Sequence, residues 1–597
     1  MGDKRALPTD FDAEALARKY AEERAKRLRN DGNAQYQVLG DVLPELDEDP
    51  HVPPGFTREP VVEEVDVLIM GGGFSGLLTA GRLREAGVDS IRIVEKGGDF
   101  GGTWYWNRYP GCACDIESYI YIPLLEETGY IPKEKYSKAP EIYQYCQHLG
   151  ERYDLYRAAL FQTIITGLRW DEDRARWITS TNRDDEIAAR FVCICGGFLS
   201  QPKLPKIPGI DSFKGHSFHT SRWDYDYTGG NSRGGLTGLA DKRVAVIGTG
   251  ATAIQCIPFL GEYAKQLYVF QRTPSSCDAR DNRPTDMDWA KTLQPGWQQH
   301  RMMNFHNIVS GIREPEDLVA DGWTDILADV GFLDSEGGEP DYAAMQLAEF
   351  AKMEKSRRRI DTIVKDPATA EALKPYYNYL CKRPCFNDEY LQTFNRDNVT
   401  LVDTQGQGVE RITETGVVVD GKDYEVDCII YATGFEFLTE YASQIGFQVH
   451  GKGGQSLSDR WSHGTRTLYG MQTRGFPNLF ILGFAQNGIT ANYTHLAGER
   501  AVHLAYLIPR LLRDDAAAVE PSQEAEDAWV QEIIDGRGPR RAFLDACTPS
   551  YYNQEGRETP ATALNDIYGA GAHVFFKILE DWRSEDRLAG LEITHAK

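Results

Sequence analysis

The chain carries two glycine-rich dinucleotide-binding fingerprints, and each one joins a short apolar run to a helical pattern. The first fingerprint, residues 71–76, follows the apolar run 65–70, and the second, residues 248–253, follows the run 243–247. This context distinguishes a Rossmann βαβ unit from a chance glycine motif, because the strand must end where the glycines turn the chain into a helix. Two such units in one chain predict two nucleotides bound at once.

Within each fingerprint the residues have distinct expected roles. Gly71 permits the tight turn, Gly73 lets the backbone approach a pyrophosphate, and Gly76 allows the helix to pack closely on the strand. Ala253 replaces the third glycine of the second copy and is small enough for that packing. The free N–H groups of each helix N-terminus face the phosphates. The fingerprint residues expected to contact the nucleotides are Gly71, Gly73, Phe74, Ser75, Gly76, Gly248, Thr249, Gly250, Ala251 and Thr252.

The residue that ends the second strand of each unit indicates which nucleotide is bound. Glu95 and Arg272 each stand 24 positions after the first glycine of their fingerprint. A carboxylate there accepts hydrogen bonds from both ribose hydroxyls and repels a 2′-phosphate, whereas a guanidinium favours a 2′-phosphate. The first site therefore suits FAD, and the second suits NADPH rather than NADH.

Composition narrows the class of protein further. A chain of 597 residues predicts about three or four domains, and a net charge of −24 disfavours nucleic acid and anionic membranes as partners. There is no secretory leader pattern, and no apolar run approaches the roughly 18 residues of a membrane span. The eleven cysteines are interpreted as small buried hydrophobes in a reducing cytoplasm rather than as a disulfide framework or a metal site. A cytoplasmic enzyme is expected.

The order of patterns predicts an α/β fold. It consists of two Rossmann-like dinucleotide-binding domains, one for FAD and one for NADP, with an inserted helical subdomain and an N-terminal helical extension. The expected parts are an N-terminal extension and linker (1–60), the FAD-binding domain (61–200 and, with the C-terminal region, 434–597), the NADP-binding domain (201–285 and 376–433) and the helical insertion (286–375).

The N-terminal extension begins with a charged helical pattern over residues 10–31, which Thr9 or Asp10 can cap and Gly32 can end. Its thin apolar face predicts packing on the surface of a larger body. Residues 47–60, which are acidic and rich in proline, predict a linker. A solvated arm is the alternative interpretation of the whole extension.

Several further motifs occur together. The segment 213–223 reads F-x-G-x-x-x-H-x-x-x-W, and 102–115 reads G-x-W-x-x-x-x-Y-P-G-x-x-x-D. The runs QRTP at 271–274, KRP at 382–384 and ATGF at 432–435 accompany them. With these motifs the chain resembles the type I Baeyer–Villiger monooxygenases, closely over residues 61 to about 500 and more loosely elsewhere.

This resemblance implies insertion of one oxygen atom of O₂ next to a ketone carbonyl, through a peroxide formed at C4a of the flavin, giving a lactone or an ester. In related enzymes that oxidise nitrogen or sulfur the signature ends in Phe or Tyr, so Trp223 followed by Asp224 favours the ketone-oxidising branch. Oxidation of amine or thioether heteroatoms is the main alternative. A disulfide-type flavin reductase and a catalytically silent FAD-binding scaffold fit the sequence less well.

The resemblance also implies site residues. Arg383 matches the family's active-site arginine, and Asp115 matches the aspartate that holds it. Lys382 matches the residue that contacts the NADP 2′-phosphate together with Arg272 and Thr273. His219, in the signature, is expected to have a conformational role rather than a direct chemical one.

Near the flavin the resemblance places Gly102, Thr103 and Trp104. Tyr551 stands where smaller-ring enzymes usually have a tryptophan that contacts the nicotinamide ribose, and Ala113 replaces a common arginine. The N-terminal extension and the run 547–556 look like those of the large-ring and steroid monooxygenases. Large cyclic, polycyclic or steroid ketones are therefore the expected substrates, for a monomer or weak homo-oligomer.

Overall fold

The computed structural model of the chain describes residues 11–325, 342–437 and 440–595. The first fingerprint lies in a mainly parallel sheet. Its central strand β2 (Val62–Met70) pairs with β3 (Ile91–Val94), which pairs with β4 (Ala159–Leu160). On the other side of β2 lies β7 (Glu186–Ile194), and β20 (Leu479–Ile481) pairs with its C-terminal half. The order β4-β3-β2-β7-β20 is that of a Rossmann unit.

An antiparallel extension of this sheet was not expected from the sequence. The N-terminal half of β7 pairs with β6 (Arg176–Thr181), which pairs in turn with β5 (Ile165–Asp171). β19 (Val449–His450) closes this edge. Trp177, on β6, is fully buried and packs in one cluster with Leu68 of β2, so the extension shares the core of the parallel part.

The second fingerprint lies in a sheet of five parallel strands. Their order is β14 (Val399–Asp403), β11 (Gln266–Gln271), β10 (Arg243–Ile247), β18 (Cys428–Tyr431) and β9 (His216–His219). Strands of such a sheet are covered on both faces, which explains why β18 is buried throughout. The expected α/β fold with two Rossmann-like units is confirmed.

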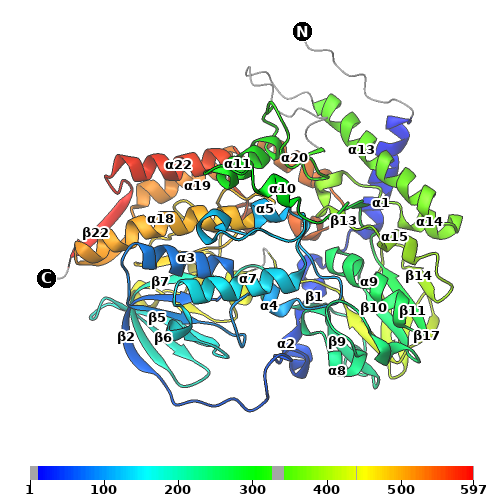
Figure 1. Cartoon of the computed structure of the whole chain (residues 1–597), viewed down its shortest axis with the longest axis horizontal. Helices are drawn as coiled ribbons and strands as arrows, with labels where there is room; N and C mark the ends of the chain where they lie inside the picture. The colour runs from blue at the N-terminus through cyan, green and yellow to red at the C-terminus, as the bar shows by residue number, and fades with distance from the viewer. Residues whose placement is uncertain (1–10, 326–341, 438–439, 596–597) are drawn as a thin grey trace, which may run out of the picture.

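The helix after each glycine loop covers its own sheet. α3 (Phe74–Glu85) follows the first loop and packs against α18 (Tyr493–Arg513), and α9 (Ala251–Tyr263) follows the second. In Figure 1 the two sheets lie on opposite sides of the lower half of the molecule, with β2 and β7 on the left and β10 and β11 on the right.

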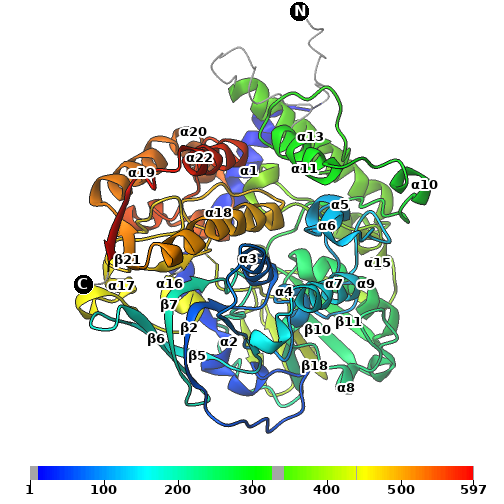
Figure 2. The ribbon, with the colours of Figure 1, turned by 60° about the vertical axis from the view of Figure 1, so that its left-hand side comes forward.

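The stretch 285–375 is mostly helical, as predicted, over the part that is described. It contains α10 (Met287–Ala290), α11 (Trp297–Val309), α13 (Tyr342–Ile363) and α14 (Pro367–Leu373), and residues 326–341 lie outside the described ranges. The C-terminal helices α19 (Gln523–Asp535), α20 (Gly538–Ala546) and α22 (Ala572–Glu585) gather above α18 in Figure 2. Within the described ranges, no helix combines the length and apolar character needed to cross a membrane.

The N-terminal helix is shorter than predicted. α1 spans Ala13–Arg27 and is capped by Asp12, whose carboxylate accepts the Ala15 N–H at 3.0 Å. The predicted caps Thr9 and Asp10 lie outside the described residues. The helix ends because Leu28 is extended, and Gly32 instead begins the 3₁₀ helix η1 (Gly32–Gln35).

After η1 the extension is built into the fold. β1 (Tyr36–Val38) pairs antiparallel with β8 (Lys203–Pro205), and Leu39 is fully buried. The predicted linker 47–60 contains no helix or strand, but it is fixed to the first unit, since the Tyr105 hydroxyl donates to Asp49 at 2.7 Å. The alternative of a solvated arm is therefore wrong for this part of the extension.

The interpretation of the cysteines was wrong for one pair. Cys381 and Cys547 form a disulfide that joins the short 3₁₀ helix η6 (Tyr379–Cys381) to the segment after α20. The two residues are 166 positions apart, so their spacing gives no signal in the sequence. The remaining cysteines are free and buried, as expected, including the C-x-C pairs that begin at Cys112 and Cys193.

We expect nine thiols to react in the denatured, unreduced chain and eleven after reduction. Replacing both Cys381 and Cys547 by alanine should abolish this difference and lower the free energy of unfolding by about 2–5 kcal/mol, because the bridge restricts a long loop of the unfolded chain. Thiol titration and denaturant unfolding measure the two effects. Eleven reactive thiols without reduction would contradict the bridge.

Candidate active site

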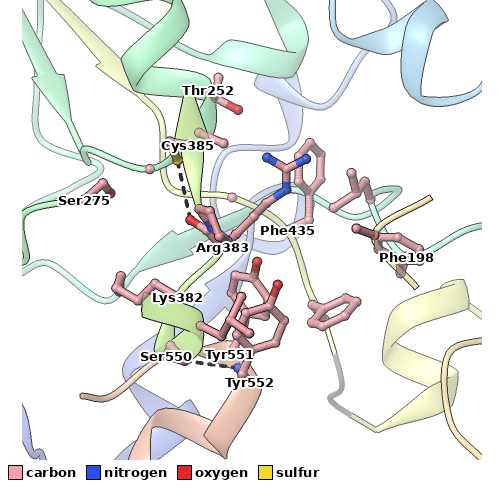
Figure 3. A pocket seen from close by; sticks show the side chains of 18 of the residues that line it. Phe198, Thr252, Ser275, Lys382, Arg383, Cys385, Phe435, Ser550, Tyr551 and Tyr552 are labelled. Atoms are coloured by element: carbon pink, nitrogen blue, oxygen red, sulfur yellow. Dashed lines mark hydrogen bonds between the residues drawn. The ribbon is translucent and has the colours of Figure 1, made fainter. Parts of the chain in front are cut away.

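One cavity of about 2020 Å³ brings together residues from both Rossmann units and from the C-terminal region. Figure 3 shows Arg383, Lys382 and Tyr551 projecting into it. The predicted residues that line it are Thr103, Trp104, Asp115, Gly248, Thr249, Gly250, Ala251, Thr252, Arg272, Thr273, Lys382, Arg383 and Tyr551. Most of the residues expected at the NADP site and at the catalytic centre therefore share one space.

The first fingerprint lies beside this cavity, with Phe74 and Ser75 buried at the start of α3. A Cβ on Gly76 would lie 1.9 Å from the carbonyl oxygen of Gly71, so only glycine allows this approach of helix and strand. A Cβ on Gly102 would lie 2.7 Å from the Cα of Gly73. The fingerprint loop thus touches the segment that continues into Thr103 and Trp104 at the cavity wall.

Glu95 stands directly after β3, where a ribose-binding carboxylate was expected. Its side chain accepts the N–H groups of Gly72 at 2.5 Å and Gly97 at 2.7 Å. Burial raises the pKa of Glu95 above its ordinary value, although these two hydrogen bonds oppose the rise. The carboxylate is fixed beside the glycine loop, which fits the ribose of an FAD.

The second fingerprint leaves room for a ligand. A Cβ on Gly248 would lie 2.4 Å from the carbonyl oxygen of Ala432, whereas Gly250 has open space within 4 Å. The Thr249 hydroxyl donates to the Thr273 carbonyl at 2.9 Å. The hydroxyl of Thr273 is buried without a hydrogen-bond partner. An open glycine and an unpaired hydroxyl beside the N-terminus of α9 fit a bound dinucleotide phosphate.

Two cationic side chains, Arg272 and Lys382, line the cavity. Arg272, just after β11, donates from one nitrogen to the side-chain oxygen of Gln35 at 2.6 Å and pairs with Glu555 at 3.3 Å through the other. Burial lowers the pKa of Lys382 to about 8, and the charge of Arg272 acts in the same direction while Glu555 opposes it. Gln35 and Glu555 come from segments near the two ends of the chain, and sequence reasoning did not identify them.

Arg383 and Asp115 form a bidentate ion pair. The two guanidinium nitrogens lie 2.5 and 2.7 Å from the two carboxylate oxygens. Asp115 is 5% exposed and Arg383 is 36% exposed. Burial disfavours the charged arginine, but the adjacent Asp115 outweighs it and holds the pKa of Arg383 well above its usual range. The cavity therefore contains a fixed cation held in one orientation.

Trp323 supports this pair from the helical insertion. Its indole N–H donates to the Asp115 carbonyl at 2.9 Å, and its ring centre lies 5.7 Å from the Arg383 guanidinium carbon. Sequence reasoning missed Trp323, since it belongs to no motif and lies far from both partners along the chain.

The C-terminal region contributes an aromatic wall. Tyr551 begins the 3₁₀ helix η8 (Tyr551–Gly556), and its ring lies 5.0 Å from that of Phe437 and 4.5 Å from that of Tyr552. Figure 3 shows both tyrosines beside Arg383. The preceding Ser550 hydroxyl donates to the Cys381 carbonyl at 2.9 Å, so the disulfide and this bond fix η8 next to the arginine.

His219 is not among the residues that line the cavity. Its ring is fully buried at the end of β9, and Nδ1 lies 2.8 Å from the Ser221 hydroxyl. Burial and the charge of Arg222 lower the pKa of His219 to about 3, so the ring is neutral. This environment fits the expected conformational role.

Comparison with known proteins places this arrangement in a family. The flavin-binding monooxygenase-like family matches residues 64–287. Neopentalenolactone D synthase of Streptomyces avermitilis is 50% identical, with 98% of this chain and 99% of the relative covered. Baeyer-Villiger monooxygenase 4 of a Dietzia species is 46% identical, with 100% and 98% covered.

A solved structure agrees with these relatives. The polycyclic ketone monooxygenase from the thermophilic fungus Thermothelomyces thermophila has a TM-score of 0.92 and 39% identity, over 98% of this chain and all of that one. The chain belongs to the Baeyer–Villiger monooxygenases that use FAD and NADPH.

Proposed function

We propose that this monooxygenase converts large cyclic, polycyclic or steroid ketones into lactones or esters, and that Arg383 stabilises the charge that develops during oxygen insertion. The observation that carries the proposal is the Arg383–Asp115 pair, which lies in the same cavity as the second glycine loop. We further propose that the enzyme works in the cytoplasm as a monomer or weak homo-oligomer, without nucleic acid or membrane partners. The net charge of −24 supports the absence of nucleic-acid and anionic-membrane partners.

The described residues fit both cofactors. The first glycine loop with Glu95 would hold FAD, and the second loop with Arg272, Thr273 and Lys382 would hold NADPH. Bound FAD would activate O₂, and bound NADPH would supply the electrons. The chain's own contribution is to bind, to orient and to stabilise charge.

Arg383 is suited to that last task. When oxygen attacks the ketone, negative charge develops on the carbonyl oxygen, and a fixed donor aimed at it lowers the barrier. Asp115 holds the pKa of Arg383 well above its usual range, which favours the cationic form. Asp115 holds the plane of the guanidinium, so little reorganisation is needed at the moment of reaction.

The cavity supports a bulky substrate. Its volume of about 2020 Å³ exceeds the roughly 300–1,000 Å³ of a typical small-molecule site, so a dinucleotide and a second large molecule fit together. Apolar side chains from α11, α13, α20 and α22, namely Val309, Met345, Phe543 and Val574, line the cavity together with Ile312, which follows α11. An apolar wall of this kind suits a fused-ring or large-ring ketone, and the name of the fungal structural relative agrees with this.

Product analysis with a ketone panel tests the proposal. We expect NADPH and O₂ to give products one oxygen atom heavier from cyclopentadecanone or progesterone, and less from cyclohexanone, because the small ring leaves most of the apolar wall uncovered. Mass spectrometry of the products gives the readout. Sulfoxide or N-oxide as the only oxygenated product, from an added thioether or amine, would favour the heteroatom-oxidising alternative.

Arg383→Ala is the matched inactive variant for this assay, and Arg169→Ala, an exposed arginine on β5, is its control. Losing the charge-stabilising donor should cut product formation about 100- to 1,000-fold. NADPH should still be consumed, with hydrogen peroxide released instead. Wild-type lactone formation by Arg383→Ala would contradict the assigned role.

The pKa of Lys382 predicts a pH dependence of NADPH binding. Lys382 is protonated below about pH 8 and neutral above it, and a bound 2′-phosphate favours the protonated form. Affinity for NADPH should therefore fall as pH rises above about 8, by at most tenfold per pH unit, while NADH binding stays nearly constant. Calorimetric titration of wild type and Lys382→Met with NADP⁺ and NAD⁺, which differ in the same phosphate but do not reduce the flavin, measures this. Identical pH profiles for the two proteins would exclude Lys382 from the phosphate site.

A further inference from the structure

The N-terminal extension reaches the second nucleotide unit rather than lying free of it. In Figure 1 the blue segment runs from α1, beside α13, past β1 to α2 (Leu39–Val42) at the lower edge. On this path Arg27 donates to the Arg272 carbonyl at 3.3 Å, and Arg29, Gln35 and Tyr36 line the cavity. The extension therefore contacts the residue that sequence and geometry assign to NADPH.

Gln35 is held at both ends of its amide. Its nitrogen donates to the Gly32 carbonyl at 2.7 Å, and its oxygen accepts from Arg272 at 2.6 Å. The side chain is 7% exposed, so this hydrogen-bonding arrangement is shielded from water. Because the amide nitrogen is already used, the carbonyl oxygen has to face the guanidinium.

Tyr36 lies next to the same guanidinium. Its ring centre is 4.0 Å from the Lys203 nitrogen and 6.0 Å from the Arg272 guanidinium carbon. The pairing of β1 with β8 fixes both Tyr36 and Lys203. The ring thus limits where the arginine can lie, in addition to the hydrogen bond from Gln35.

We propose that residues 32–36 of the N-terminal extension form one wall of the NADPH 2′-phosphate subsite, in which Gln35 is a positioning residue that aims the Arg272 guanidinium at the phosphate. The proposal rests on the assignment of Arg272 to NADPH made above. Glu555 holds the other terminal nitrogen of the guanidinium, so Arg272 is fixed by one residue of the N-terminal extension and one of the C-terminal region. A neutral amide at position 35 orients the cation without adding a negative charge that would oppose the phosphate.

Two substitutions at this position separate positioning from packing. Gln35→Ala removes the hydrogen bond and leaves Glu555 to hold the guanidinium from the other side. Gln35→Glu has nearly the same shape and keeps a partner for Arg272, but it adds a negative charge beside the phosphate. If residue 35 only packed the extension against the protein, Gln35→Glu would not change the preference for a ligand that carries the 2′-phosphate over one that lacks it.

The probes are adenosine 2′,5′-bisphosphate, which carries the 2′-phosphate, and adenosine 5′-monophosphate, which lacks it. Calorimetry on the full-length FAD-loaded enzyme gives their dissociation constants, and steady-state kinetics gives KM and kcat with NADPH and NADH. Arg272→Ala is the reference variant. Gln531→Ala and Gln531→Glu, at an exposed glutamine of α19, are matched controls.

We expect Gln35→Ala to weaken binding of the bisphosphate by about tenfold, the loss of one charge-assisted interaction, and Gln35→Glu to weaken it by a similar factor through repulsion between the new carboxylate and the 2′-phosphate. Binding of the monophosphate, KM for NADH and kcat at saturating NADPH should stay at wild-type values. Should Gln35→Ala fail to fold, the nearly isosteric Gln35→Glu variant still decides whether residue 35 lies at the 2′-phosphate, and unchanged bisphosphate binding by it would overturn the proposal.

Each other outcome has a definite meaning. If Arg272→Ala weakens the bisphosphate but neither Gln35 variant does, the extension only packs there and this inference is wrong. Equal weakening of both probes by the Gln35 variants would also overturn it, because the 2′-phosphate would not be what is recognised. If Arg272→Ala itself leaves bisphosphate binding unchanged, the assignment of the NADPH site fails first.

Discussion

The pairing of Arg383 with Asp115 is the constraint on which the site depends. A carboxylate that is 5% exposed is unfavourable unless a partner compensates for its lost hydration, and Arg383 supplies two hydrogen bonds. Asp115 follows the segment next to the first glycine loop, whereas Arg383 lies between β11 and β14 of the second sheet in the order of the chain. The ion pair therefore joins the two nucleotide-binding halves at the point where we propose that the oxygen atom is transferred.

The two ends of the chain complete the site that the halves enclose. Gln35 and Glu555 contact the two terminal nitrogens of Arg272, and the disulfide between Cys381 and Cys547 fixes η8 beside Arg383. The cavity at the second glycine loop is thus lined by residues of the N-terminal extension, the Rossmann unit and the C-terminal region. This arrangement gives a structural role to the N-terminal extension and to the run 547–556, the two regions that look like those of the large-ring and steroid enzymes.

The fold could be predicted where local pattern decides it. The apolar run 243–247 coincides with β10, and Glu95 and Arg272 stand directly after β3 and β11 because a Rossmann unit fixes that spacing. Trp323, Gln35 and the partner of Cys381 could not be predicted, since their contacts join segments far apart in the sequence. The cap of α1 was misplaced because Asp12 satisfies the same local rule as Thr9 and Asp10.

The most direct test of this account is a double-mutant cycle on the ion pair, with Arg383→Ala, Asp115→Asn and the double variant. Lactone formation under ¹⁸O₂ gives the rate of oxygen insertion, separately from peroxide release. If Asp115 acts by holding Arg383, Asp115→Asn lowers the rate alone and causes no further loss once Arg383 is absent. Losses that multiply in the double variant would show two independent roles and would contradict the account.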